Sequence, residues 1–583
     1  MKRTTAERSA PHILVLTRMI HCALVGLPRS PRSIGACAGV LAIALAAGTA
    51  QADMFEIGLN FTGTTLTDEL TAHGIGDIPP DTMGGVGPNH IAELINGNYA
   101  AYNKSTGALI GSRISDNTFF QNALNNGGGG TVVDTFDPRL VYDHDSNRWF
   151  ATAVDERNAI TSSIMLAVSD STDPTSGWTG FRMDADSADT RWADFPTLGL
   201  DADGVYVSAN MFNIEGGPPF ENTDTTVFSF PKADLLLATP TVANRTEFQI
   251  AGIFSRGFAV QPAIDFGASD GRAALLARPN GSGLHNTLKR TDVLNAGGSA
   301  TLSPSASISV ALFEAPPLAH QPGPDDNIYV TDHRIGSNVF EQGDSLWAVH
   351  AIRIVNDPND IGDDRAGIEW FEIDETDNSV LQTGIISDAD LDLYYPSIAA
   401  NADGDLVIAF SGSSDNQHIS SYAVAGTTDA GVTTLGDVTL LKAGASTYLR
   451  LDSSSRNRWG DYSATVLDPL KSNRFWTFQE FVFATNVWGI QITEITVPQP
   501  ATLAILLFGG LAMCRRPMRR RGQGVPQSCN GGVDRINRIG GGDLQDQREQ
   551  ESKRAREQEI GVRPLPCFSA LPLSCSDRPV NPV

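Results

Sequence analysis

FPTLGLDADGVYVSAN, residues 195–210, and YPSIAANADGDLVIAF, residues 395–410, align with each other without a gap. Each begins with an aromatic residue and Pro, continues into an apolar run, and reaches a turn of the form Asp/Asn-Ala-Asp-Gly before a second apolar run. Asp-Gly between two apolar runs is a strong short-range signal for a β-hairpin. The pair therefore predicts two copies of one strand–turn–strand unit.

Further copies extend this pair into a repeat. RWADFP from Arg191 resembles RWGDYS from Arg458, and looser copies begin near residues 80, 138, 262 and 325. The spacing of about 60 residues suits a four-stranded unit with a long loop. We predict an all-β fold, a β-propeller of seven blades with six as the alternative.

The strand 54–61 is expected to pair with the last blade, at 486–495, and close the ring. A rival architecture is a pair of stacked sandwich domains, which predicts no common register between the copies.

Charge and cysteine content limit the function classes. Residues 53–496 hold roughly 58 acidic and about 23 basic side chains, a net charge of about −35. Such a field repels nucleic acid and anionic membranes. All six cysteines lie outside 53–496, which excludes a disulfide, a thiol nucleophile or a Cys-ligated zinc within that segment.

The N-terminal region has the pattern of a secretory signal peptide. A short apolar run, GACAGVLAIALAAG at residues 35–48, follows basic residues and ends in Ala-Gln-Ala before Asp53. This predicts cleavage by signal peptidase after Ala52. The preceding segment is long for a signal peptide, so translation could start at Met1 or Met19.

A second targeting pattern follows the repeat. Val497, Pro498, Gln499 and Pro500 precede the apolar run 501–514, which is shorter than the ~20 residues that span a bilayer. A cluster of arginines follows at once: Arg515, Arg516, Arg519, Arg520 and Arg521. This cluster is a strong stop-transfer signal.

The order Pro-x-Pro, apolar helix and arginine cluster over 497–521 resembles the PEP-CTERM sorting signal. The resemblance implies export, transient membrane insertion through 501–514, and processing near Val497, Pro498 and Pro500 by an exosortase. It places the protein at the cell surface or outside the cell. Gln499 stands where that family usually has Glu, and residues 522–583 extend beyond the usual end of the signal. Their polar, Pro- and Ser-rich composition predicts a disordered tail.

Acidic residues recur where the predicted first strands begin. They are Asp137, Asp194, Asp392 and Asp461, with Asp81 nearby, and Arg191 and Arg458 each precede one of them by three residues. First strands line the channel of a propeller, so these side chains are candidates for a binding funnel or a Ca²⁺ site. The alternative is structural: the aspartates cap turns and accept hydrogen bonds from backbone amides between blades. Repetition across the blades favours the structural role.

A denser acidic loop, Asp184, Asp186 and Asp189, is a second candidate for a cation such as Ca²⁺. Asp201-Ala-Asp203-Gly204 and the matching turn at 401–404 resemble the start of a calcium loop but lack its closing Glu, so they are predicted to be hairpin turns.

Two classes of function remain. The first is a non-catalytic surface propeller that binds a glycan, a matrix polymer or a protein, and this class is favoured. The second is a glycoside-processing enzyme, because VSDSTDPTSGWTGF at 168–181 loosely resembles the Asp-box hairpin of sialidase-like propellers. That resemblance implies an arginine cluster and a Tyr nucleophile. The candidates are Arg139, Arg191, Arg334 and Arg458, with Tyr394 or Tyr395. No spacing selects among them, so the sequence assigns no catalytic residue.

Overall fold

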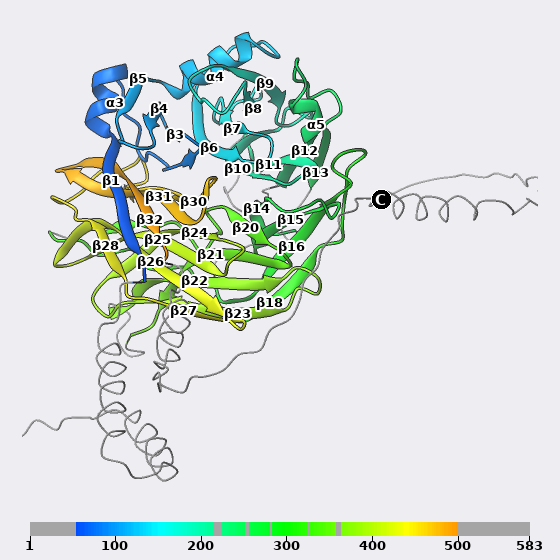
Figure 1. The fold of residues 1–583 in the computed structure, drawn as a ribbon. Coiled ribbons are helices and arrows are strands. Elements are labelled where there is room, and N and C mark those ends of the chain that lie inside the picture. Colours follow the sequence, from blue (N-terminus) through cyan, green and yellow to red (C-terminus); the bar gives the residue numbers. More distant parts are fainter. Residues whose placement is uncertain are drawn as a thin grey trace, which may run out of the picture. The chain divides into compact units, whose positions relative to one another are not determined.

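The computed structural model describes residues 54–498 except 215–223, 251–255, 280, 282, 324–326 and 357–362. The predicted signal peptide, the span 501–514 with Arg515 and Arg516, and the tail after 521 lie outside the described residues. Within them the chain is mainly β-strand, as predicted (Figure 1). Its helices are short: α3 (Leu66–His73), α4 (Asp116–Asn125) and α5 (Lys232–Leu235). In the described part of the chain, no helix is long and apolar enough to cross a membrane.

The strands follow one another in antiparallel groups, each named here by its first strand. The β2 group contains β2 (Gly84–Val86), β3 (His90–Ile95), β4 (Asn98–Asn103) and β5 (Leu109–Ile114). The β6 group contains β6 (Thr135–Asp143), β7 (Arg148–Asp155), β8 (Ser163–Ser169) and β9 (Trp178–Asp184). The β10 group contains β10 (Arg191–Leu200), β11 (Gly204–Asn213), β12 (Asp224–Pro231) and β13 (Thr246–Ile250). The β14 group contains β14 (Phe258–Asp265), β15 (Arg272–Arg278), β16 (His285–Leu294), β17 (Thr301–Leu302) and β18 (Ala306–Phe313).

The second half of the chain repeats this order. The β20 group contains β20 (Val339–Gln342), β21 (Ser345–Ile354), β22 (Arg365–Asp374) and β23 (Val380–Ile386). The β24 group contains β24 (Asp392–Ala400), β25 (Asp405–Ser414), β26 (Gln417–Asp429), β27 (Val432–Leu435) and β28 (Thr439–Lys442). The β30 group contains β30 (Ala464–Asp468), β31 (Lys471–Ala484) and β32 (Val487–Thr496). Between groups, β19 (Ile328–Tyr329) pairs in parallel with β29 (Asn457–Arg458).

The N-terminal strand β1 (Glu56–Thr65) completes the last group. It pairs antiparallel with β32, with Glu56 opposite Thr496 and Phe61 opposite Ile492. The expected pairing of 54–61 with 486–495 is therefore confirmed.

First strands of successive groups touch each other. β2 contacts β6, and the contacts continue through β10, β14, β20, β24 and β30, which returns to β2. Parallel pairing joins three of these strands: β10 to β14 and β14 to β20. The first strands thus form a closed cycle.

The hairpin turns explain why the repeat folds locally as it does. Asp201 Oδ1 accepts hydrogen bonds from the Asp203 and Gly204 amides, and Gly404 has a φ of +85° that favours glycine. Both Asp/Asn-Ala-Asp-Gly turns connect the first and second strands of a group, as predicted.

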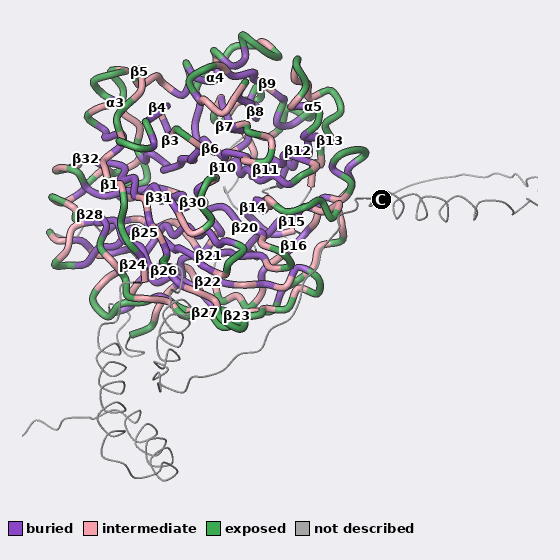
Figure 2. The backbone as a smooth tube through the Cα atoms, in the orientation of Figure 1, coloured by how far each residue is buried: buried purple, intermediate pink, exposed green. Residues whose placement is uncertain are grey.

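Apolar side chains from different groups meet between the sheets, and buried backbone (purple in Figure 2) runs through the inner strands. One hydrophobic cluster contains residues from four groups: Val154, Leu198, Ile368 and Ile408. None of these four residues has exposed surface. Seven of the eight tryptophans are buried, as expected for core positions; Trp192 is half-buried. That exception lies in the functional region described below.

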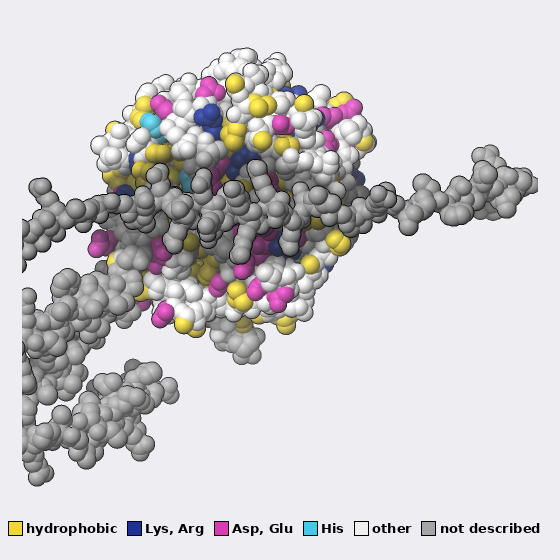
Figure 3. Space-filling model, turned by 45° about the vertical axis from the view of Figure 1, so that its right-hand side comes forward, with side chains coloured by type: hydrophobic (Ala, Val, Ile, Leu, Met, Phe, Trp, Pro, Cys, Tyr) yellow, Lys and Arg dark blue, Asp and Glu magenta, His cyan; other side chains and the backbone are white. Residues whose placement is uncertain are grey.

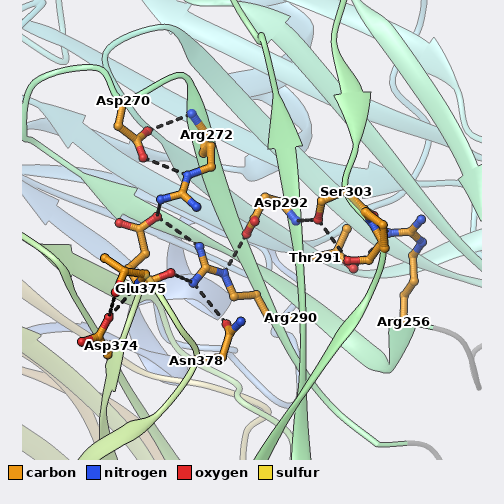
Figure 4. A network of polar contacts seen from close by, with 12 residues as sticks. Arg256, Asp270, Arg272, Arg290, Thr291, Asp292, Ser303, Asp374, Glu375 and Asn378 are labelled. Carbon is orange, nitrogen blue, oxygen red and sulfur yellow. Dashed lines mark hydrogen bonds and ion pairs between the residues drawn. The ribbon is translucent and has the colours of Figure 1, made fainter.

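Ion pairs reinforce the seam between the β14 and β20 groups (Figure 4). Glu375, just past β22, forms ion pairs with Arg272 (2.9 Å) on β15 and Arg290 (3.0 Å) on β16. Arg290 also donates to Asp292 at 2.7 Å. Because Glu375 and Arg290 are buried, this network fixes the two groups against each other.

Candidate functional site

A residue with a left-handed backbone conformation recurs within the first strands or in the loop before them. Non-glycine residues with φ between +48° and +55° occur at Asp81, Asp137, Phe195, Ala259, Thr331 and Tyr395. At four of these positions the ladder shows a β-bulge: after Phe136, Asp194, Phe258 and Tyr394. Pro follows the left-handed residue at 138, 196 and 396. A bulge re-aims side chains, and such bulges are common beside functional sites.

These strand starts surround a cavity of about 880 Å³. Its charged walls come from many groups. The acidic residues that line it are Asp77, Asp81, Asp134, Asp137, Asp194, Asp452 and Asp461, and the basic ones are Arg157, Arg334, Arg456 and Arg458. The aromatic residues that line it are Phe136, Trp192, Phe212, Phe258 and Tyr329. Acidic side chains are also spread over the outer surface, shown in magenta in Figure 3.

Two of the cavity arginines are held by neighbouring carboxylates. Arg334 donates from Nε and Nη2 to Asp332 at 3.0 and 3.1 Å, and its guanidinium lies 4.5 Å from the centre of the Phe195 ring. Arg458 donates to Asp461 at 3.0 Å. The charge of Asp461 raises the pKa of Arg458, so the Arg458 guanidinium stays positively charged.

Arg456, which also lines the cavity, is likewise paired with a carboxylate. It donates to Asp452 at 2.7 Å and its guanidinium lies 4.8 Å from the centre of the Tyr329 ring. Arg157 differs: it is exposed, and its guanidinium lies 4.4 Å from the centre of the Phe136 ring.

Two carboxyl groups meet at the buried side of the cavity. Asp81, 1% exposed, accepts a hydrogen bond from Asn96 Nδ2 at 2.8 Å, and its Oδ1 has no partner within the described residues. Burial, followed by the charges of Asp461 and Asp137, raises its pKa well above the ordinary value. The charge of Asp137 contributes to this shift, and Asp137 accepts a hydrogen bond from the Phe195 amide at 3.1 Å. A proton on Asp81 relieves the repulsion between the two carboxyl groups.

Asp194 stands apart because nothing in the described residues hydrogen-bonds its carboxylate. Burial raises the pKa of Asp194 to about 7, and the charge of Asp137 adds to this shift. Trp192 lies two residues earlier on β10, so both side chains leave the strand on the same face. The cavity wall therefore presents a carboxyl group beside an indole ring.

Four of the six predicted funnel residues line the cavity: Asp137, Asp194, Arg458 and Asp461. Arg191 does not. It forms an ion pair with Asp224 on β12, because residues three apart in an extended strand point to opposite faces. Arg458 reaches Asp461 because the chain leaves β29 between them.

Asp392 also lies away from the cavity. It has no exposed surface, and it accepts hydrogen bonds from the His320 and Ala366 amides at 2.8 Å each. Its carboxylate thus ties β22 to the neighbouring group, which is the structural role considered above. Asp137 combines both roles, since it lines the cavity and also holds the Phe195 amide.

In the acidic loop 184–189, proposed above as a cation site, backbone amides hydrogen-bond two of the aspartates. Asp186 accepts hydrogen bonds from the backbone amides of Ala188, Thr190 and Arg191 at 2.9 to 3.2 Å, and Asp184 accepts the Asp186 amide. Backbone donors thus occupy oxygens that a cation would need. Across the described ranges, no three His, Cys, Asp or Glu side chains are arranged to hold a metal ion.

The structure does not bring together the arginine cluster and the tyrosine that the sialidase-like resemblance implied. Tyr394 shares a hydrogen bond with Ser413 at 2.8 Å, and Tyr395 donates to the Tyr329 carbonyl at 2.9 Å. Arg139 is fully buried and does not line the cavity, and its guanidinium lies 3.4 Å from the centre of the Tyr462 ring. Of the four candidate arginines, only Arg334 and Arg458 line the cavity.

Sequence reasoning missed the aromatic part of the site. Trp192, Tyr329 and Phe258 occur on strands or loops that do not share a recognisable motif. The available signal was Trp192 itself, which stands two residues before Asp194 in RWADFP.

Comparisons with known proteins give only weak similarities. No protein-family description matches the chain, and no curated protein matches it. A sialidase from Trypanosoma rangeli bound to 2,3-difluorosialic acid shares 11% identity at a TM-score of 0.31, over 74% of this chain and 62% of its own. Drosophila Plexin A in complex with Semaphorin 1b shares 8% identity at a TM-score of 0.33, over 77% of this chain and 88% of its own. An α-L-arabinofuranosidase from Fusarium graminearum shares 8% identity at a TM-score of 0.33, over 62% of this chain and 93% of its own. At these scores the similarities carry no argument about this chain.

Proposed function

We propose that this chain is an exported, seven-bladed β-propeller whose central cavity binds a carbohydrate without transforming it. The closed cycle of first strands, β2 through β30, supports a ring of seven blades over two stacked sandwiches. The pairing of β1 with β32 completes the last blade, as closed propellers require.

The location rests on the sequence. The pattern ending at Ala52 supports export by signal peptidase, and the segment 497–521 supports sorting by an exosortase-like enzyme. We propose that the propeller then acts at the cell surface or outside the cell, where an extracellular polysaccharide is an available ligand.

The observation that carries carbohydrate binding is the placement of Trp192 beside Asp194 on one cavity wall. A sugar ring presents an apolar C–H face that packs on an aromatic ring, and hydroxyl groups that donate to carboxylates. The carboxyl-rich wall offers several acceptors within one ligand-sized space.

Binding of the purified chain to a panel of soluble oligosaccharides tests the proposal. We expect at least one oligosaccharide to bind, and Trp192→Ala to weaken that binding by about tenfold or more, because it removes the stacking surface. Phe483→Ala, which changes an aromatic side chain 45% exposed and away from the cavity, is the control. If no oligosaccharide binds, the proposed function is wrong.

Glycoside hydrolysis is the second candidate, because a carboxyl group with a pKa near 7 suits a general acid. It predicts product release from the same panel, with Asp194→Asn abolishing release while leaving some binding. Binding without release favours the non-catalytic function.

A further inference from the structure

We infer that the saccharide held in the cavity carries a protonated amino group, bound by the Asp194 carboxylate beside Trp192. This inference rests on the proposed carbohydrate binding and specifies the class of sugar. It follows from which charges in the cavity already have partners.

Three of the four arginines that line the cavity already form ion pairs with aspartates. Arg334 is held by two hydrogen bonds to Asp332, and Arg458 and Arg456 are held by Asp461 and Asp452. An anionic sugar would have to displace these partners. Arg157 lacks such a partner among the described residues, but it is exposed to water and lies over Phe136. The cavity is therefore poorly prepared for a carboxylated sugar.

Some of the carboxyl oxygens that line the cavity lack a hydrogen-bond partner among the described residues. No hydrogen bond joins the half-buried Asp194 carboxylate to another residue of the described part of the chain. The fully buried Asp81 Oδ1 has no partner there either. Both side chains line the cavity. A buried acceptor without a donor costs free energy, and a ligand that supplies charged N–H donors recovers it.

An ammonium group fits this wall better than a metal ion does. No described set of three acidic or histidine side chains has the arrangement that a metal ion needs. An ammonium group needs fewer acceptors, and it also interacts favourably with an adjacent indole face. Trp192 supplies that face one side-chain spacing from Asp194.

The test compares tetramers of glucosamine, N-acetylglucosamine and glucose that share one linkage, by calorimetry on the purified chain. We expect the glucosamine tetramer to bind at least about tenfold more tightly than the other two, since only it offers a charged donor. Asp194→Asn should remove this preference. Asp429→Asn makes the same charge change at an exposed site outside the cavity and should preserve it.

The outcomes separate this inference from the function beneath it. Equal binding of glucose and glucosamine tetramers overturns the inference and leaves carbohydrate binding in place. No binding of any tetramer, with binding of a lysine peptide or stabilisation by Ca²⁺ instead, overturns both. An unchanged melting curve of Asp194→Asn, recorded at pH 5, shows that lost preference does not reflect misfolding.

Discussion

At the scale of single residues, Asp194 combines a useful charge with an energetic cost. Its ordinary pKa of 3.8 applies in the unfolded chain, whereas burial raises its pKa to about 7 in the folded protein. The folded state therefore binds its proton more tightly, and stability falls as the pH rises from about 4 through about 7. Above pH 7 the folded protein keeps an ionised carboxylate to which no described residue donates a hydrogen bond.

We therefore expect Asp194→Asn to stabilise the protein while removing the preference for the glucosamine tetramer. At pH 8 the melting temperature should rise by about 1 to 3 °C, and the gain should be smaller at pH 5, where the folded wild-type carboxyl group is already protonated. Thermal unfolding followed by circular dichroism at both pH values measures this. The Asp429→Asn control should show no gain, and an equal gain at both pH values would contradict the assigned protonation.

At the scale of elements, the pairing of β1 with β32 joins residues more than 400 positions apart. Glu56 lies directly opposite Thr496, at a separation typical of paired antiparallel strands that a disulfide can bridge. No native cysteine lies between them to compete.

The double variant Glu56→Cys/Thr496→Cys should thus close the largest loop of the fold. Because the cross-link restricts the unfolded chain, oxidation should raise the melting temperature by about 3 °C or more. Scans with and without a reductant, beside the wild type, measure the effect. A confirmed disulfide without any rise would mean that unfolding does not begin by separating β1 from β32.

At the scale of the whole molecule, about 58 acidic against 23 basic side chains over 53–496 make repulsion the dominant long-range electrostatic effect. Salt at 0.1 M screens charges beyond about 10 Å. Raising NaCl from about 20 to about 500 mM should therefore increase the melting temperature, even though exposed ion pairs weaken. A decrease would show that local ion pairs outweigh the net charge.

The repeat made the order of the strand groups predictable, because hairpin turns and alternating apolar runs are written locally in sequence. The site was only partly predictable. Asp137, Asp194, Arg458 and Asp461 were found from their recurrence, but Arg191 was wrongly joined to them because its strand stays extended. The residues with a left-handed backbone conformation near the strand starts share no sequence pattern apart from the Pro that follows three of them. Trp192 was grouped with the seven core tryptophans, although it stands two residues before Asp194.

The position of β1 at the edge of its sheet has a mechanical consequence. A tether that leaves after Thr496 pulls on β32, which is held on one side by β1 and on the other by β31. A tether before Glu56 would pull on β1, which is hydrogen-bonded to only one strand of that sheet and could peel away. The fold thus bears load better through its C-terminal strand, the end that precedes the predicted sorting signal.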